Sequence, residues 1–317
     1  MGFQIVGTGR AVPEHILTNE EVSKLVDTTD EWITVRTGIK SRFVSTHETI
    51  TDLASQAAVK ALQKAGIDAK ELDLIVCSTV MAEHASPSLS CMVQKEIGAT
   101  CPAFDINAAC SGFVYGLDIA DAYITTGKAE TVLVVGAEVM TRHVDWTDRA
   151  SCVLFGDGAG AVILKKGDGL KAIRLTAKGD DKLLTIGSTF CKSPFGKQPV
   201  LDPHFKMNGT EVFKFAVGAG LKDVKTVMKE AGVTSDEVKM VIPHQANLRI
   251  FQAIKEKLGL SDDQVASGID HYGNTSSASI PLMLDELIEA GRLVPGDIIV
   301  MTAFGGGLTS GACVIKL

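Results

Sequence analysis

An internal repeat constrains the fold of this 317-residue chain more than any other feature of its sequence. Residues 60–76 (KALQKAGIDAKELDLIV) resemble residues 225–242 (KTVMKEAGVTSDEVKMVI), and the glycine expected to end each helix falls at the same place. Residues 116–136 resemble residues 280–305 in the same way, and each half then ends in a glycine-rich turn and a short strand. Three matches in one order indicate two related halves.

Strands and helices are predicted to alternate within each half. Residues 73–80 and 131–136 are short, β-branched apolar runs typical of buried strands. Residues 52–65 place leucine and alanine on one helical stripe. This alternation predicts an α/β fold with parallel sheets covered by helices. We divide the chain into an N-terminal half, residues 1–168, and a C-terminal half, residues 169–317.

Charge and hydropathy exclude several classes of protein. The formal net charge is −7, so the chain lacks the basic surface with which nucleic-acid-binding proteins neutralise phosphates. No apolar run approaches the ~20 residues needed to span a bilayer, and the first residues lack the pattern of a signal peptide. We therefore predict a protein that neither binds nucleic acid nor inserts into a membrane.

The cysteines suggest a reducing compartment. There are seven, an odd number, and none forms a C-x-x-C pair. This pattern favours free thiols in the cytoplasm over a disulfide framework or a structural zinc site, so we expect no bound metal. Most are expected to be small buried hydrophobes. The seven are Cys77, Cys91, Cys101, Cys110, Cys152, Cys191 and Cys313.

Two glycine-rich segments could suggest a nucleotide site, but their context argues against it. Residues 7–9 (GTG) follow a strand-like start with no helix after them, and residues 156–160 (GDGAG) lead into another strand. A phosphate-binding loop needs a helix N-terminus to hold the anion. We predict tight turns at both places.

Cys110 differs from the other cysteines in its context. It lies in the run INAACSGF, between a predicted strand at residues 102–106 and a predicted helix that ends at Gly127. Small neighbours allow a sharp strand-to-helix turn that presents the thiol outward, as in nucleophile elbows. The helix dipole is expected to lower the thiol pKa, and the thiolate could then accept an acyl group. A small cysteine buried under the turn is the alternative, and spacing alone does not separate the two.

The repeat brings two more polar residues to similar positions. Asn274, in the run YGNTSSAS, aligns with Cys110 and also precedes a predicted helix. His244, in PHQAN, follows the predicted strand at residues 239–242. A single histidine is usually a satisfied core residue, and an asparagine after glycine is usually a turn residue. Because α/β sheets place their sites at the carboxyl ends of strands, the three together favour a functional site.

Four motifs, in order along the chain, resemble those of the β-ketoacyl-acyl carrier protein synthase III family. They are residues 109–112 (ACSG), 243–247 (PHQAN), 273–276 (GNTS) and 304–307 (FGGG). The resemblance covers nearly the whole chain, including residues 28–38. It implies the thiolase fold, with five layers in the order α-β-α-β-α built from two duplicated halves, and usually a homodimer.

The resemblance implies the initiating condensation of type II fatty acid synthesis. An acyl-CoA primer and malonyl-acyl carrier protein would give 3-oxoacyl-acyl carrier protein, CoA and CO₂. Cys110 would carry the acyl group, with the backbone N–H groups of Cys110 and Gly306 as the oxyanion hole. His244 and Asn274 would donate hydrogen bonds to the enolate left by decarboxylation. No permanently bound cofactor is implied, since acyl-CoA is a substrate and acyl carrier protein a partner.

The resemblance also points to residues that contact the substrates. The candidate CoA contacts are Thr28, Trp32, Arg36, Arg149, Gly209 and Asn247. The candidate contacts with the acidic carrier protein are Lys214, Arg249 and Lys257. The candidate acyl-pocket residues are Ser86, Phe155 and Met207.

Ser86 leads to a prediction about primer length. Family members restricted to short primers often carry an aromatic residue at this place, and it closes the acyl pocket of the partner subunit. A serine would leave room for acyl groups longer than acetyl. Alternatively, Leu89, Phe155 or Met207 refills the space, because protein interiors pack without voids.

Related activities remain open. A biosynthetic thiolase would need a second reactive cysteine near the C-terminus, but Cys313 lies in a strand pattern and is expected to be buried core. A synthase that primes a polyketide or another secondary metabolite, or an acyltransferase of the same fold, would share all four motifs. The sequence fixes neither the primer nor the pathway.

Overall fold

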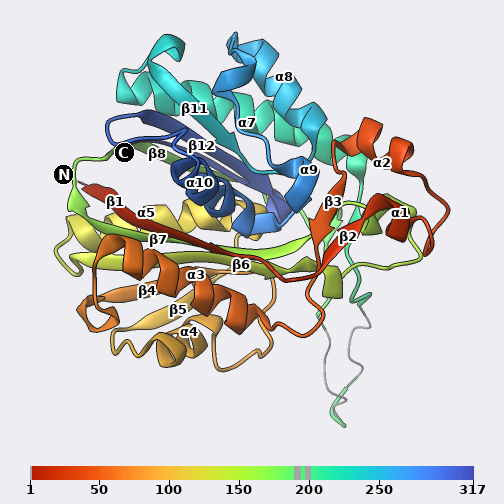
Figure 1. Cartoon of the computed structure of the whole chain (residues 1–317), viewed down its shortest axis with the longest axis horizontal. Coiled ribbons are helices and arrows are strands. Elements are labelled where there is room, and N and C mark those ends of the chain that lie inside the picture. The colour runs from red at the N-terminus through yellow and green to blue at the C-terminus, as the bar shows by residue number, and fades with distance from the viewer. Residues whose placement is uncertain (1, 189–193, 197–200) are drawn as a thin grey trace.

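Two β-sheets lie face to face in the computed structural model, which describes residues 2–188, 194–196 and 201–317 (Figure 1). Cys191 lies outside these ranges. The first sheet has the order β1-β7-β6-β4-β5. Its strands are β1 (Gly2–Ala11), β4 (Leu74–Ser78), β5 (Ala103–Ile106), β6 (Thr131–Val139) and β7 (Asp157–Gly167).

The second sheet has the order β11-β12-β13-β8. Its strands are β8 (Leu170–Ala177), β11 (Val238–Pro243), β12 (Ile298–Gly305) and β13 (Thr309–Lys316). Read from β8, this sheet has two antiparallel pairs followed by one parallel pair, whereas the first sheet, read from β1, has two antiparallel pairs followed by two parallel pairs. The proposed division after residue 168 falls between β7 and β8, and it stays a prediction.

The prediction of parallel sheets is correct only in part, because each sheet combines parallel and antiparallel pairs. The reason is clearest for β12 and β13, which are joined by the short 3₁₀ helix η7 (Gly306–Leu308) and pair antiparallel. A parallel pair needs a crossover of a dozen or more residues, which such a turn cannot supply.

Helices form three further layers, which the view of Figure 1 shows edge-on. Two helices cover the outer face of the first sheet: α3 (Ile50–Ala65) and α4 (Leu89–Ile97). Two lie between the sheets: α5 (Gly112–Thr125) and α10 (Ser279–Glu289). Two lie beyond the second sheet: α7 (Gly209–Ala231) and α8 (Leu248–Leu258). The expected α-β-α-β-α layering is confirmed.

Shorter elements complete the described chain. The strands are β2 (Ile16–Thr18), β3 (Ser41–Phe43), β9 (Leu184–Thr185) and β10 (Lys206–Met207). The helices are α1 (Asn19–Val22), α2 (Asp30–Thr37), α6 (Arg149–Cys152) and α9 (Ile269–Tyr272). Within the ranges that the structure covers, no helix combines the length and the apolar character needed to cross a membrane.

Helix ends follow the local rules that the sequence indicated. The helix predicted at residues 52–65 is α3, which begins two residues earlier behind a capping box of Thr49 and Asp52. Gly66 ends it with φ 65°, and Gly232 ends α7 with φ 67°. Glycine adopts this left-handed backbone without steric cost, so the same signal ends the corresponding helix in both halves.

Both glycine-rich segments lie within strands, so the prediction of tight turns is wrong. The GTG run is part of β1, and most of the GDGAG run is part of β7. A Cβ added at Gly9 would collide with the carbonyl oxygen of Ala57 in α3. One added at Gly160 would come 2.6 Å from the backbone nitrogen of Leu282 in α10. These glycines therefore allow helix backbones to pack directly on the strands.

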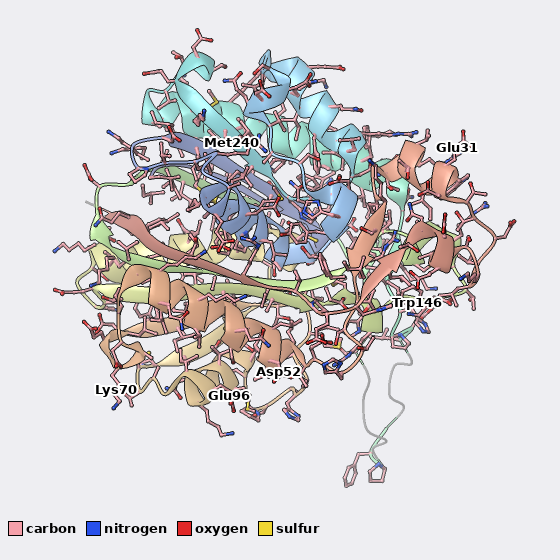
Figure 2. All side chains as sticks on the ribbon, in the orientation of Figure 1. Glu31, Asp52, Lys70, Glu96, Trp146 and Met240 are labelled. Atoms are coloured by element: carbon pink, nitrogen blue, oxygen red, sulfur yellow. The ribbon has the colours of Figure 1, made fainter. Side chains whose placement is uncertain are left out.

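Apolar side chains fill most of the space between the layers, and most charged ones lie at the surface (Figure 2). Met240 of β11 is buried in the cluster that also contains residues of α5 and α10. Lys70 and Glu96 are exposed at the outer surface beside α3 and α4.

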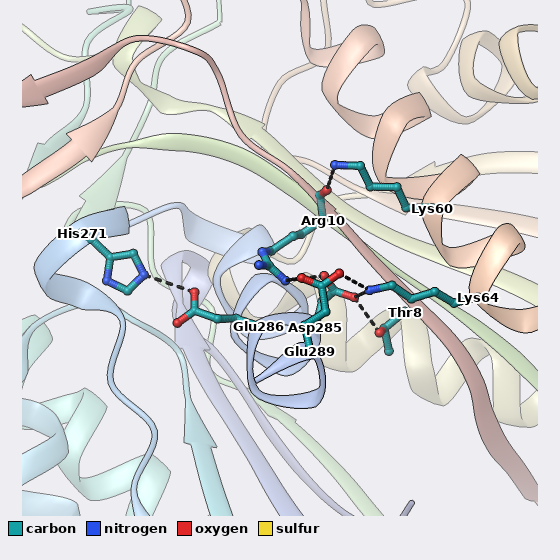
Figure 3. Close-up of polar contacts among 8 residues, drawn as sticks. All are labelled: Thr8, Arg10, Lys60, Lys64, His271, Asp285, Glu286 and Glu289. Atoms are coloured by element: carbon teal, nitrogen blue, oxygen red, sulfur yellow. Dashed lines mark hydrogen bonds and ion pairs between the residues drawn. The ribbon is translucent and has the colours of Figure 1, made fainter. Parts of the chain in front are cut away.

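A buried carboxylate ties the middle layer to the first sheet (Figure 3). Asp285 of α10 accepts hydrogen bonds from Thr8 Oγ1 at 2.7 Å and from Arg10 Nη1 at 2.6 Å, both on β1. It also pairs with Lys64 Nζ of α3 at 2.6 Å. Its side chain is 1% exposed, whereas Glu289, which binds the same two cations, is 46% exposed.

Replacing Asp285 with Ala should destabilise the fold by about 2 kcal/mol. Removing one partner of a fully buried ion pair costs roughly 3–5 kcal/mol, and the partial exposure of Arg10 and Lys64 reduces that cost. Urea unfolding followed by circular dichroism would measure it. Glu289→Ala is the matched control and should cost less than about 1 kcal/mol, since exposed pairs contribute little. Equal losses in both variants would show that burial of Asp285 is not what matters.

Candidate active site

Cys110 lies in a sharp turn between β5 and α5. It belongs to the short 3₁₀ helix η2 (Ala109–Ser111), which leads directly into α5. Ala109 has φ 48°, in the left-handed region that residues other than glycine rarely adopt. Its N–H donates to Asn107 Oδ1 at 3.1 Å, which supports this backbone. The strand–turn–helix geometry predicted around Cys110 is therefore present.

The chemistry of the Cys110 thiol differs from the prediction. Its pKa is raised to about 12, chiefly because burial disfavours the thiolate. A hydrogen bond from Ser276 Oγ, 3.4 Å from Sγ, lowers the pKa in part, while the negative charge of Glu138 raises it. The predicted lowering of the pKa is wrong, because loss of solvent outweighs any effect of the helix terminus.

His244 is a neutral hydrogen-bond donor at the end of β11. Burial lowers the pKa of its imidazole to about 3, so the ring carries no charge at neutral pH. Nδ1 lies 2.8 Å from Ser279 Oγ, and that oxygen also accepts the N–H of Gln245 at 3.3 Å. We assign the serine hydroxyl as donor to Nδ1, which leaves the hydrogen of the imidazole on Nε2.

Asn274 is held in one orientation by its own backbone and its neighbour. Its N–H donates to the carbonyl oxygen of Leu154 at 2.8 Å. Its side-chain Oδ1 accepts the N–H of Ser276 at 2.9 Å. Because Oδ1 is used in this way, the Nδ2 amide hydrogens remain available to a bound molecule.

One cavity of about 630 Å³ joins these groups. Its lining includes all four predicted catalytic residues, Cys110, His244, Asn274 and Gly306. Gly305 also lines it, and a Cβ there would come 2.6 Å from the backbone nitrogen of Cys110. Glycine is thus required where the β12–η7 turn approaches the thiol.

A tryptophan and two guanidinium groups meet at the cavity. Arg36 and Arg149 lie over the Trp32 ring at 4.5 Å and 4.7 Å from its centroid. Of the six predicted CoA contacts, four line the cavity: Trp32, Arg36, Gly209 and Asn247.

The other two predicted CoA contacts lie outside this lining. Arg149 reaches Trp32 through the cation–π contact. The buried hydroxyl of Thr28 finds no hydrogen-bond partner in the described part of the chain. Asn247 already donates to the carbonyl oxygen of Arg36 at 3.2 Å and caps α8, so its side chain also has a structural use.

The predicted acyl-pocket residues divide into two groups. Phe155 and Met207 line the cavity. Ser86 is exposed on the loop before α4 and lies outside the lining. Leu89 is buried against the outer face of the first sheet, so it does not refill space in this cavity.

The predicted carrier-protein contacts are exposed but not all adjacent. Arg249, at the start of α8, has Nη2 3.5 Å from the carbonyl oxygen of Val35 on α2. Lys214 on α7 pairs with Glu211 at 2.7 Å. Lys257 lies eight positions after Arg249 on α8, or ~12 Å along the helix. Of the three, Lys214 and Arg249 lie near the starts of helices that begin beside the cavity, whereas Lys257 lies at the far end of α8.

Three functional candidates were missed from the sequence. They are Glu138, Ser276 and Ser279, which surround Cys110 and His244. A signal existed for Glu138, because it is an acid inside the otherwise apolar run of β6. Ser276 belonged to the GNTS motif, but no role was assigned to it, and nothing in the sequence distinguished Ser279 from its small neighbours.

Comparison with known proteins gives a single family. Residues 104–180 match the family model described as 3-oxoacyl-[acyl-carrier-protein (ACP)] synthase III, and residues 228–317 match the model of its C-terminal part. The β-ketoacyl-[acyl-carrier-protein] synthase III of Aquifex aeolicus is 47% identical over 100% of both chains. That of Clostridium acetobutylicum is 46% identical over 99% of this chain and 98% of its own.

Solved structures of similar proteins indicate the same family. The crystal structure of the Aquifex aeolicus synthase III has a TM-score of 0.94 at 46% identity, with 100% of both chains covered. The priming β-ketosynthase of the R1128 polyketide pathway has a TM-score of 0.93 at 35% identity, covering 100% of this chain and 96% of its own. This chain therefore belongs to the β-ketoacyl-[acyl-carrier-protein] synthase III family of thiolase-fold condensing enzymes.

Proposed function

We propose that this chain initiates fatty acid synthesis by a decarboxylative Claisen condensation in which Cys110 carries the acyl group. One observation supports this proposal above the others. A single cavity contains the Cys110 thiol and two neutral hydrogen-bond donors, His244 and Asn274, and its lining extends to Trp32. A nucleophile and donors for a developing oxyanion are what such a reaction requires.

The first half-reaction is acyl transfer to Cys110. Sγ attacks the thioester carbon of an acyl-CoA, and CoA leaves. The N–H groups of Cys110 and Gly306 stabilise the oxyanion of the tetrahedral intermediate. The close approach of Gly305 to Cys110 supports this pairing of the two turns.

The second half-reaction is condensation. His244 Nε2 and Asn274 Nδ2 donate to the thioester oxygen of malonyl-acyl carrier protein, which stabilises the enolate formed as CO₂ leaves. The α-carbon of the enolate then attacks the acyl carbon on Cys110, and the thiol is regenerated. The neutral state of His244 suits this role, because it stabilises charge without removing a proton.

The substrates are proposed to arrive at the Trp32 end of the cavity. The CoA adenine would stack on Trp32, with the guanidinium groups of Arg36 and Arg149 near the phosphates. The acidic carrier protein would dock on Arg249 and Lys214, with Lys257 further along α8. We expect no permanently bound cofactor and a cytoplasmic location.

A homodimer is a further part of the proposal. In the described residues, β5 forms an edge of the first sheet and pairs only with β4. Ser86 is exposed on the same half of the chain, where a partner could use it. If Ser86 of one subunit adjoins the acyl pocket of the other, primers longer than acetyl are expected.

Priming of a polyketide is the second candidate. The similarity to the R1128 priming ketosynthase, at 35% identity over the whole chain, supports this second candidate function. Mass analysis of products from a panel of acyl-CoAs with carrier proteins of both pathways would separate the two.

Cys110 is predicted to be the only acylation site. Treatment with acyl-CoA should place one adduct on the Cys110 peptide in mass spectrometry, and Cys110→Ser should abolish it. Cys91→Ser is the control, because Cys91 is exposed but lies outside the cavity. An adduct on another cysteine would contradict the proposed function.

His244→Ala and Asn274→Ala should impair decarboxylation more than acylation. Loss of one oxyanion-type donor costs ~10²–10³ in rate, so malonyl decarboxylation should fall by that factor while Cys110 still accepts the acyl group. Because burial lowers the pKa of His244 to about 3, decarboxylation should show no histidine inflection near neutral pH. Quench-flow measurement of both half-reactions tests this division, and it is wrong if acylation fails first.

Arg249→Glu should weaken use of malonyl-acyl carrier protein and leave acylation by acyl-CoA intact. Charge reversal removes electrostatic attraction, so the loss should shrink as salt is raised. Lys229→Glu is the control. It also reverses one positive charge, but in the last turn of α7, and it should retain wild-type kinetics. Similar losses in both half-reactions would indicate general damage.

A further inference from the structure

A buried carboxylate lies next to the Cys110 thiol and has no role in the reaction described so far. Glu138 of β6 is 1% exposed. It accepts hydrogen bonds from the Val80 N–H at 3.0 Å, from Thr79 Oγ1 at 3.2 Å and from Ser277 Oγ at 2.8 Å. These donors are all neutral, and no salt bridge to Glu138 occurs in the described ranges. A buried acid without a cation is costly to keep, which calls for a functional reason.

Ser276 connects this carboxylate to the reacting sulfur. Its Oγ lies 3.1 Å from Glu138 Oε1 and 3.4 Å from Cys110 Sγ. The Ser276 hydroxyl has one hydrogen, so it donates to only one of these two atoms at a time. When it donates to Glu138 Oε1, its oxygen can accept the hydrogen of the Cys110 thiol. Ser276 is fully buried and has φ 50°, the left-handed region. Such strain in a residue other than glycine persists where the surroundings impose it, often at active sites.

The thiol needs a proton acceptor when it attacks. Burial raises its pKa to about 12, so very little thiolate exists at neutral pH. Free ionisation would also place two negative charges side by side, because the pKa of Glu138, raised mainly by burial, is about 7. On the facing η2 turn, the titratable group that interacts electrostatically with Glu138 is the Cys110 thiol. His244 is neutral and cannot supply a counter-charge.

We propose that Ser276 and Glu138 form a proton relay that removes the Cys110 proton during acylation. As Sγ bonds to the acyl carbon, its proton passes to Ser276 Oγ, while the hydroxyl proton of Ser276 passes to Glu138 Oε1. The hydroxyl is unchanged, Glu138 becomes neutral, and CoA leaves as a thiolate that takes a proton from solvent. Condensation later releases Cys110 as a thiolate, which recovers its proton from Glu138 by the reverse route.

The relay keeps one negative charge in the buried site at each stage. The charge begins on Glu138, leaves on CoA, returns with the malonyl carboxylate, and ends on Glu138 again after CO₂ departs. The whole cycle consumes one proton from solvent, as the overall reaction requires. In this scheme Ser276 is a catalytic residue, because it contacts the reacting sulfur. Glu138 acts through Ser276 and is a positioning residue that also holds the proton.

Ser277 offers a matched control. Its Oγ lies 2.8 Å from the same oxygen, Glu138 Oε1, which is nearer than its other acceptor, the carbonyl oxygen of Ser78, at 3.1 Å. Among the described contacts it has none with Cys110 Sγ. Ser277→Ala removes a donor to the ionised carboxylate, which should raise the pKa of Glu138 without cutting the relay. Ser276→Ala removes both a donor and the link to the thiol.

The experiment is the pH dependence of Cys110 alkylation by iodoacetamide, measured on the intact enzyme by mass spectrometry. In the wild type the rate should rise with pH through an inflection near 7, since only ionised Glu138 accepts the proton. Glu138→Gln and Ser276→Ala should lose this inflection and react about 10²-fold more slowly at neutral pH. Ser277→Ala should keep it, displaced to higher pH. Glu138→Asp should restore it in part.

An inflection near 7 that survives in Glu138→Gln or Ser276→Ala would overturn the relay, and so would equal slowing of all variants at every pH. If Glu138→Gln does not fold, the comparison of Ser276→Ala with Ser277→Ala decides alone. The inference rests on the proposed role of Cys110, but the two can fail separately. Absence of an acyl adduct on the Cys110 peptide defeats the proposed function, whereas a normal adduct with no inflection near 7 defeats only the relay.

Discussion

Burial of polar groups at the contact between the two halves is the constraint on which the site depends. The η2 turn of the first half and the η6 turn (Ser276–Ala278) of the second meet between the sheets. Burial there makes His244 neutral, suppresses the thiolate of Cys110 and raises the pKa of Glu138. Each group thus differs from its form in water, and for a single reason: the charged state has lost its solvent.

The architecture supplies this buried contact by bringing backbones unusually close. A Cβ at Gly136 of β6 would come 2.6 Å from the carbonyl oxygen of Ser277, so η6 could not approach the strand that carries Glu138. Gly305 permits the same closeness between the β12 end and Cys110. Glycine and serine at these positions therefore set which polar atoms meet, and the fold cannot be separated from the chemistry.

Much of this arrangement could be predicted from the sequence, because it depends on local rules. Periodicity located α3, a glycine marked its end, and the repeat aligned Asn274 with Cys110. Strand direction was predicted wrongly in part. β13 pairs antiparallel with β12 because only the three residues of η7 join them, and β7 pairs antiparallel with β6. The glycines of β1 and β7 were mistaken for turns because their partners, α3 and α10, are distant in sequence.

The electrostatics of the site escaped prediction for a related reason. A helix terminus near Cys110 can be inferred from the chain itself, whereas desolvation depends on everything packed around it. The sequence therefore indicated a lowered thiol pKa where the assembled site raises it. Ser276 shows the same limit: its importance comes from lying between Cys110 and Glu138, residues that are 28 positions apart from each other and far from it in sequence. A nucleophile that burial holds protonated needs a nearby base, and only the folded chain reveals which residue provides it.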